Sequence, residues 1–163
     1  MREIRFNFPG DGDWVMRRCY GVFNDKTDEV IAVHRDGEIA GGVVYNLFLR
    51  TAIMLHMAGS EDNWAPRDFL WMVYDYPFNV KKVRWLLGLV DSTNTRAIEI
   101  DMRMGFAEVA RLPRILEGGS DLIVLGMERH QCWALNNITP KLWRPINRKG
   151  GSLDGLEIIR TLQ

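Results

Sequence analysis

The chain has 163 residues, 47% hydrophobic and 26% charged, which is enough for one globular domain with a real core. Basic and acidic residues both number 21, and a formal charge of zero excludes an overall positive field that would hold nucleic acid non-specifically. No run of 18 apolar residues and no signal-peptide core occurs, so we expect neither a membrane span nor export from the cytoplasm. Cys19 and Cys132 have no partners at metal-ligand spacing, so we expect no metal site.

The first sixty residues predict a strand, a helix and three further strands. The strand covers residues 3–8, and the acidic residues of the following PGDGD turn can cap a helix near 14–23. Two β-rich runs then meet at Asp36-Gly37, which favours a two-residue hairpin because glycine tolerates the positive φ of that turn. Residues 51–59, TAIMLHMAG, continue as a third strand of this group.

A helix and a buried strand are predicted next. Asp62 or Asn63 can cap the helix. Pro66 is tolerated in its first turn, and Pro77 ends or kinks it. Four apolar residues share one face of this helix: Phe69, Met72, Val73 and Tyr76. Residues 83–90, VRWLLGLV, are almost all apolar, which is typical of a central strand.

The segment NTRAIEIDMRMGF, residues 94–106, has two interpretations. Apolar and polar residues alternate along most of it, as in a strand. At helical spacing the same apolar residues form two rows, Asn94 or Thr95 can cap the first turn, and Gly105 can supply the left-handed residue that ends a helix. Because both helix ends are accounted for, we expect a helix over 95–104.

The last third predicts a hairpin and an arm. AEVARLPRILE and SDLIVLGMER are two runs separated by Gly118-Gly119, which read as a pair of strands. We expect one domain over residues 1–135 and an extended arm over 136–163. The arm ends in apolar residues at near-helical spacing: Leu153, Leu156, Ile159 and Leu162. So short a helix is marginal alone, so its face needs a partner, either its own domain or another subunit.

The predicted order is strand, helix, three strands, helix, strand, helix and two strands. Asn94, Ala97 and Gly105-Phe106, directly after an apolar strand, match the Asn-x-x-Ala, helix, Gly-Phe segment of the GNAT superfamily of N-acetyltransferases, which the sequence therefore resembles. YPF at 76–78 and SDLIVLGMERHQCWAL look like phage-encoded members. The resemblance implies an α/β (α+β) fold, with a mixed, mostly antiparallel central sheet of about six to seven strands flanked by helices.

The resemblance implies an N-acetyltransferase that uses acetyl-CoA and moves the acetyl group to an unidentified amine by direct attack on the thioester. In the family, acetyl-CoA lies in a split between the fourth and fifth strands, here 51–59 and 83–90. Its pyrophosphate sits at the amino end of the next helix, where free amides and the helix dipole meet an anion. The usual glycine-containing loop before that helix is absent, and EDNWAPRDF stands in its place. The candidate cofactor-binding residues are Asn94, Ala97, Arg67 and Trp64.

Catalysis needs an acid and a base. Many members carry a tyrosine four residues after the helix alanine, which protonates the departing thiolate, and this sequence has Asp101 there. A carboxyl group can replace it only if its site raises its pKa; the alternative is an exposed helix acid. Glu61, at the end of the fourth strand, is the candidate base. His56 on the same strand could titrate near neutrality or serve as a hydrogen-bonded residue of the sheet.

A second function stays open because the phosphate loop and the tyrosine are missing. The chain could be a structural or assembly component of a phage particle, non-catalytic or weakly catalytic, docked through residues 137–163. The expected partners are acetyl-CoA and an unknown amine, with a homo-oligomer or a larger phage assembly formed through the arm. The expected location is the host cytoplasm or the virion.

Overall fold

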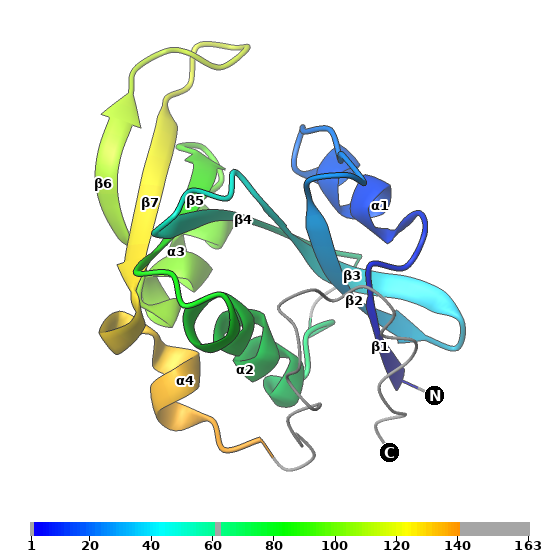
Figure 1. Ribbon diagram of the computed structural model, residues 1–163. Coiled ribbons are helices and arrows are strands. Elements are labelled where there is room, and N and C mark those ends of the chain that lie inside the picture. Colours follow the sequence, from blue (N-terminus) through cyan, green and yellow to red (C-terminus); the bar gives the residue numbers. More distant parts are fainter. Residues whose placement is uncertain (1, 61–62, 141–163) are drawn as a thin grey trace.

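The computed structural model describes residues 2–60 and 63–140. Its strands and helices follow one another in the predicted order, with one short helix added at the end (Figure 1). They are β1 (Arg2–Phe6), α1 (Asp11–Arg18), β2 (Glu29–Arg35), β3 (Glu38–Asn46), β4 (Ala52–Gly59), α2 (Arg67–Asp75), the π-helical turn η1 (Tyr76–Val80), β5 (Trp85–Asp91), α3 (Thr95–Met104), β6 (Ala107–Leu112), β7 (Leu122–Glu128), the 3-10 turn η2 (Arg129–Gln131) and α4 (Trp133–Asn137).

The seven strands form one mixed sheet in the order β1-β2-β3-β4-β5-β7-β6. All neighbours are antiparallel except β4 and β5, which run parallel. This is the predicted mixed, mostly antiparallel sheet, and the predicted pairing of 51–58 with 83–90 is confirmed. The two parallel strands are the junction between a four-stranded part, β1 to β4, and a three-stranded part, β5, β7 and β6 (Figure 1).

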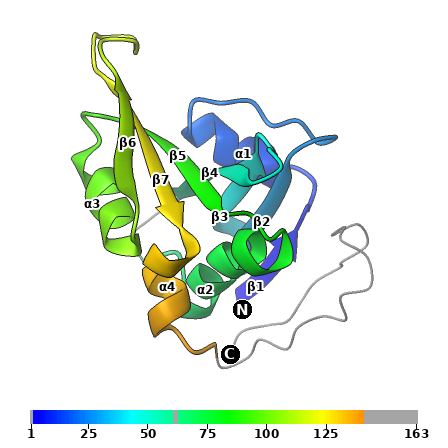
Figure 2. The same ribbon diagram turned by 60° about the vertical axis from the view of Figure 1, so that its left-hand side comes forward.

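Helices cover both faces of the sheet. On one face, Val15 and Met16 of α1 pack with Val30, Ala32 and Val44 in a small core. On the other face, α2, α3 and α4 enclose a larger core, and α4 packs against both α2 and α3 (Figure 2). The alternation of side chains along each strand feeds both cores, because successive residues point to opposite faces.

The hairpin between β2 and β3 has the predicted turn. Asp36 has φ 51° and Gly37 has φ 89°, so both central residues adopt the left-handed conformation that a tight two-residue turn requires. At the other end of the sheet, Gly118 and Gly119 are also left-handed, at φ 90° and 84°. They lie in a longer loop between β6 and β7, and β6 ends at Leu112, earlier than the sequence run suggests.

The segment 95–104 is a helix, and the strand interpretation is wrong. The Asn94 side-chain oxygen accepts a hydrogen bond from the Ala97 amide at 3.1 Å, which caps the first turn. Gly105 has φ 113°, and its N–H bonds to the Asp101 carbonyl. A Cβ at Gly105 would lie 2.0 Å from the Gln131 carbonyl oxygen, so glycine also allows η2 to pack there.

The two predicted apolar rows of α3 are only partly buried. Ala97, Ile98 and Met104 pack against the larger core, whereas Ile100 and Met102 are 46% and 51% exposed. The side of the helix that faces the core includes a polar residue, Asp101. Apolar spacing therefore indicated a helix correctly but did not fix which side of it would be buried.

Other helix boundaries differ from the predicted ones. α1 spans Asp11–Arg18, not 14–23, because Gly10 and Tyr20 take left-handed conformations on either side of it. α2 begins at Arg67 behind Pro66, so Asn63 does not cap it. At the predicted kink, Pro77 lacks the amide that an α-helix needs, and the chain continues as η1, with the Lys81 amide bonded to the Tyr76 carbonyl.

The carboxyl-terminal arm falls largely outside the described residues. Of its first residues, Ile138 is 6% exposed and belongs to the larger core. The predicted amphipathic segment over 153–162 lies beyond residue 140. The boundary at 135 and the docking role of the arm stay predictions.

Gly105→Ala should lower the free energy of unfolding by about 2–3 kcal/mol, because it adds left-handed strain and a collision with the Gln131 backbone. Gly118→Ala is the matched control: Gly118 has φ 90°, but nothing lies within 4 Å of the added Cβ, so only the strain of about 1 kcal/mol applies. Equal losses in urea denaturation of the two variants would contradict the contact between α3 and η2.

Candidate active site

The two parallel strands part soon after they begin. β4 and β5 share three residue pairs, from Ala52 with Trp85 to Met54 with Leu87. Beyond them, β4 stays paired with β3 as far as Gly59, and β5 stays paired with β7 as far as Asp91. The facing edges of the two strands are thus without a strand partner, and such edges present backbone N–H and C=O groups. We call this place the strand split.

Two helices begin at the open end of the strand split. Since β4 and β5 are parallel, both run toward that end, and α2 and α3 follow them (Figure 1). The turn before α3 is held by Asp91, which accepts hydrogen bonds from the Thr93 amide and hydroxyl at 2.9 and 2.8 Å and from the Ser120 hydroxyl at 3.1 Å. Helix amino ends carry partial positive charge, so this end of the split suits an anion.

The amino end of α2 has no side-chain cap among the described residues, and Pro66 occupies the capping position. Among the described residues, no side chain therefore caps the first-turn amides of α2. Arg67 is exposed, with its guanidinium carbon 5.8 Å from the centre of the Trp133 ring. Asp68 lies in the same turn and opposes an anion. Arg67 is thus placed at the expected helix end, and its role in binding stays a prediction.

Trp64 lies flat on two glycines of the sheet. Gly41 and Gly59 are directly paired across β3 and β4, and a Cβ on either would lie 2.2 or 2.0 Å from the Trp64 ring. The ring also meets Phe69 edge-on, at 5.4 Å between centres. Trp64 therefore anchors the loop after β4, and a direct contact with a ligand stays a prediction. Gly41 and Gly59 are the signal that sequence reasoning missed, because a glycine within a strand can mark the close approach of a large side chain.

Asn94 and Ala97 stand at the start of α3, as expected. The Asn94 oxygen is engaged by the Ala97 amide, so the exposed side-chain NH₂ group is what Asn94 can offer a ligand. Ala97 is half-buried against the core. Ala97 and Asp101 share the inward stripe of the helix, in agreement with the predicted common face.

Asp101 is half-buried, not an exposed helix acid. Burial raises the pKa of its carboxyl group from 3.8 to about 6. Its charge acts on Tyr74 of α2, which is 1% exposed: burial and the Asp101 charge both raise the pKa of Tyr74. At pH 7 roughly one carboxyl group in ten is then protonated, so the site supplies the acid form that proton donation requires.

Glu61, the candidate base, lies outside the described residues, and its role stays a prediction. His56 is the titratable residue on the open edge of β4, and its Nε2 lies 3.0 Å from the Asn46 side-chain oxygen. Over the described ranges, no three His, Cys, Asp or Glu side chains gather in a way that could hold a metal ion. Nor does any helix there have the length and apolar character needed to cross a membrane.

No protein-family model and no curated protein sequence matches the chain. Solved structures do match. Mutant forms of the spermidine/spermine N-acetyltransferase SpeG from Vibrio cholerae align with a TM-score of 0.66 at 13% identity, covering 83% of this chain and 98% of theirs. A putative acetyltransferase, YncA from Salmonella typhimurium with its cofactor acetyl-CoA, aligns at 0.62 and 15%, covering 78% and 94%. A putative phosphinothricin N-acetyltransferase aligns at 0.58 and 14%, covering 78% and 98%.

The chain has a GNAT-like fold. At 13–15% identity the likeness concerns the arrangement of the chain, and the three similar structures described above are acetyltransferases by name. The fold predicted from the Asn94, Ala97 and Gly105-Phe106 frame is therefore correct. What this GNAT fold does depends on its own side chains at the strand split.

Asp101→Asn should stabilise the protein at pH 8 by about 1–2 kcal/mol and have little effect below pH 4. The folded-state pKa lies above the unfolded value, so the native state binds the proton more tightly, and stability falls as pH rises from about 4 to about 6. Urea denaturation across this pH range measures the free energy of unfolding of both proteins. Glu99→Gln, on the exposed side of α3, is the control. An unchanged pH dependence in Asp101→Asn would mean that the carboxyl group is not buried.

Proposed function

We propose that the protein is an acetyl-CoA-dependent N-acetyltransferase, which moves an acetyl group to an amine by direct attack of the amine on the thioester. The observation that carries the proposal is the parting of β4 and β5 after three residue pairs, with a helix amino end following each strand. Acetyltransferases of the same fold support it, among them one solved with acetyl-CoA.

The strand split suits the extended arm of acetyl-CoA. That arm contains amide groups, which can bond to the free backbone edge of β4 from residue 55 to 59, as an added strand would. The fit is weaker at the phosphate end. The α2 amides and the Arg67 side chain would hold the phosphates, while Asp68 opposes them and the loop lacks the glycines that allow close approach.

Bound acetyl-CoA supplies a thioester whose carbonyl carbon an uncharged amine can attack. Asn94 would orient it through the free NH₂ group of its side chain, and the small Ala97 would leave room beside the helix. Asp101 in its acid form would donate a proton to the departing sulfur. Trp64, which packs on Gly41 and Gly59 of the sheet, would border the site. Glu61, directly after β4, remains a candidate base.

The finer parts of the proposal rest on sequence alone. They are a phage-encoded origin, suggested by YPF at 76–78 and SDLIVLGMERHQCWAL, and a location in the host cytoplasm. The alternative of a virion or assembly component depends on residues 137–163, of which the structure describes only the first four. Nothing in the described part of the chain favours that alternative over the enzyme.

Arg67→Glu should abolish acetyl-CoA binding. In the unaltered protein, acetyl-CoA at a hundredfold excess over its dissociation constant should add about 2.7 kcal/mol of stability, seen as a higher melting temperature. The unliganded variant should melt almost unchanged, because Arg67 is exposed in a first turn where Glu is well placed. Arg103→Glu, exposed in the last turn of α3, makes the same charge change and should bind normally.

Calorimetry with acetyl-CoA, coenzyme A and a desulfo analogue separates binding of the arm from binding of the thioester. If millimolar acetyl-CoA gives neither binding heat nor a melting shift on folded protein, the enzyme proposal is wrong.

Asp101→Asn should lower the turnover number by roughly 100-fold and leave the dissociation constant of acetyl-CoA unchanged, because only the proton donated to sulfur is lost. Glu99→Gln, two residues away and exposed, should keep full activity. Thiol release measures turnover, and equal rates in the two variants would remove Asp101 from the mechanism.

A further inference from the structure

The register of the sheet brings three polar residues together on the α1 face, beside the strand split. His56 of β4 is paired with Val44 of β3, which belongs to the small core under α1. Side chains two residues apart share a face, so Asn46 lies on this face as well. Glu29 is paired with Tyr45, which places Asp28, the residue before it, alongside Asn46. His56, Asn46 and Asp28 thus form a row that leads from the split outward.

The α1 face gives an acceptor amine access to the strand split. The amino ends of α2 and α3 lie on the opposite face of the sheet, so a cofactor held there reaches the split from that side. A thioester lying between the parted strands then leaves the α1 face free for the second substrate. His56 stands at that opening, two residues past the last pair between β4 and β5.

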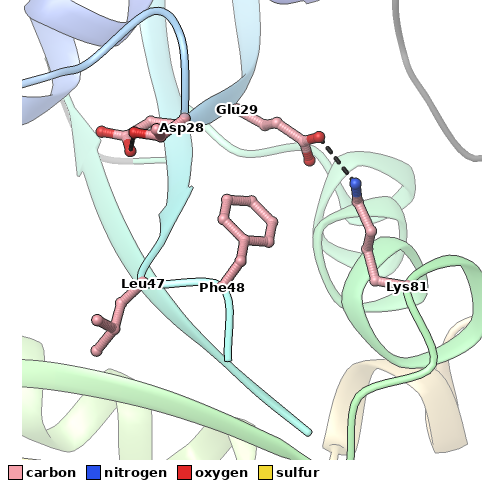
Figure 3. Close-up of a pocket in the computed structure, with 6 residues that line it drawn as sticks. Asp28, Glu29, Leu47, Phe48 and Lys81 are labelled. Atoms are coloured by element: carbon pink, nitrogen blue, oxygen red, sulfur yellow. Dashed lines mark hydrogen bonds and ion pairs between the residues drawn. The ribbon is translucent and has the colours of Figure 1, made fainter. Parts of the chain in front are cut away.

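A shallow depression adjoins the row (Figure 3). Its lining residues are Thr27, Asp28, Glu29, Leu47, Phe48 and Lys81. Glu29 and Lys81 form an ion pair at 2.8 Å on one side of Phe48, and Asp28 and Leu47 lie on the other. Lys81, the cation that lines the depression, is therefore neutralised by Glu29 and not by Asp28.

No cationic side chain among residues 2–60 and 63–140 forms an ion pair with Asp28. Its carboxylate accepts hydrogen bonds from the Asn24 amide at 3.0 Å and the Thr27 hydroxyl at 2.9 Å, and both donors are neutral. These bonds hold the carboxylate in a defined position at the mouth of the depression. Leu47 and Phe48 beside it are 52% and 39% exposed, so the same mouth offers apolar contact. A carboxylate next to exposed apolar side chains suits a protonated amine on an apolar body.

His56 is held ready to accept a proton. The Asn46 oxygen can only accept, so the Nε2 of His56 donates to it, and in the neutral ring Nδ1 then carries the lone pair. Burial lowers the pKa of the imidazole and so favours the neutral ring, and the Asp28 charge partly opposes this. The other titratable groups nearby are Cys19 of the α1 end, whose pKa burial raises to about 11, and the Glu29–Lys81 pair. Asp91 of β5 is bound to Thr93 and Ser120.

We propose that His56, in place of Glu61, is the general base of the acetyl transfer and that Asp28 binds the protonated acceptor, a primary amine carried on an apolar chain. This deepens the proposed function and rests on it. The ammonium group pairs with Asp28, His56 removes one proton, and the neutral nitrogen forms the new bond to the carbonyl carbon as the bond to sulfur breaks. The sulfur takes the proton of Asp101. The nitrogen loses two protons in the reaction. His56 passes one of them to water, and the other protonates Asp101 again.

The test uses acetyl-CoA and hexylamine with the full chain and measures thiol release against pH. His56→Gln should lower kcat/KM by roughly 100-fold, leave the acetyl-CoA dissociation constant unchanged, and remove the limb of the profile that rises with pH at its acidic end. His130→Gln, at an exposed position, is the control. Equal profiles for His56→Gln and the unaltered protein would overturn the role of His56.

Two further variants separate the base from the amine site. Asp28→Asn should raise the KM for hexylamine about tenfold with kcat within about twofold, whereas Asp25→Asn, in the same loop and exposed, should change neither. Asn46→Asp should move the acidic limb to higher pH, because a carboxylate at Nε2 favours the imidazolium; this readout holds even if His56→Gln fails to fold.

The outcomes distinguish the two proposals. If acetyl-CoA does not bind, the acetyltransferase function itself fails. If it binds and hexylamine is not acetylated, or if Asp28→Asn and Asp25→Asn behave alike, the acceptor class inferred here is wrong while the acetyltransferase function stands.

Discussion

The strand split depends on one feature of the sheet: β4 and β5 share three residue pairs and then follow different partners. Each strand has a complete antiparallel ladder on its other side, β4 with β3 and β5 with β7, and those ladders hold the two edges apart. A polar backbone edge is acceptable in a folded protein when water or a ligand can reach it. The remaining site residues matter because of where they stand relative to this split.

The helix after β5 combines structure and chemistry in few residues. Asn94 caps it, Gly105 ends it, and the stripe between them turns Ala97 and Asp101 toward the core. Placing a carboxyl group on that inward stripe costs stability, since burial disfavours the charge. Tyr74 of α2 is more deeply buried and its pKa is raised well above the usual value, so of the two Asp101 is the group that can release a proton near neutral pH. The helix thus carries an acid where many acetyltransferases of this fold have a tyrosine.

The two faces of the sheet divide the work that we propose. The α2 and α3 face brings helix amino ends and Arg67 to one side of the split, while the α1 face brings His56, Asn46 and Asp28 to the other. A two-substrate reaction needs such an arrangement, because the cofactor and the amine must reach the same atom without displacing each other. The register of β2, β3 and β4 aligns the second group, although its members lie far apart in the chain.

The sequence by itself determined what short-range chemistry controls. The order of elements, the hairpin at Asp36-Gly37 and the ends of α3 follow from turn and capping preferences of neighbouring residues, and the GNAT resemblance rested on that same local frame. Only the tertiary structure decided that Asp101 is turned inward, that Trp64 lies on the paired Gly41 and Gly59, and that β4 and β5 part after three pairs. These outcomes depend on contacts between residues that are distant in the chain, and periodicity carries no information on which partner will cover a given side chain.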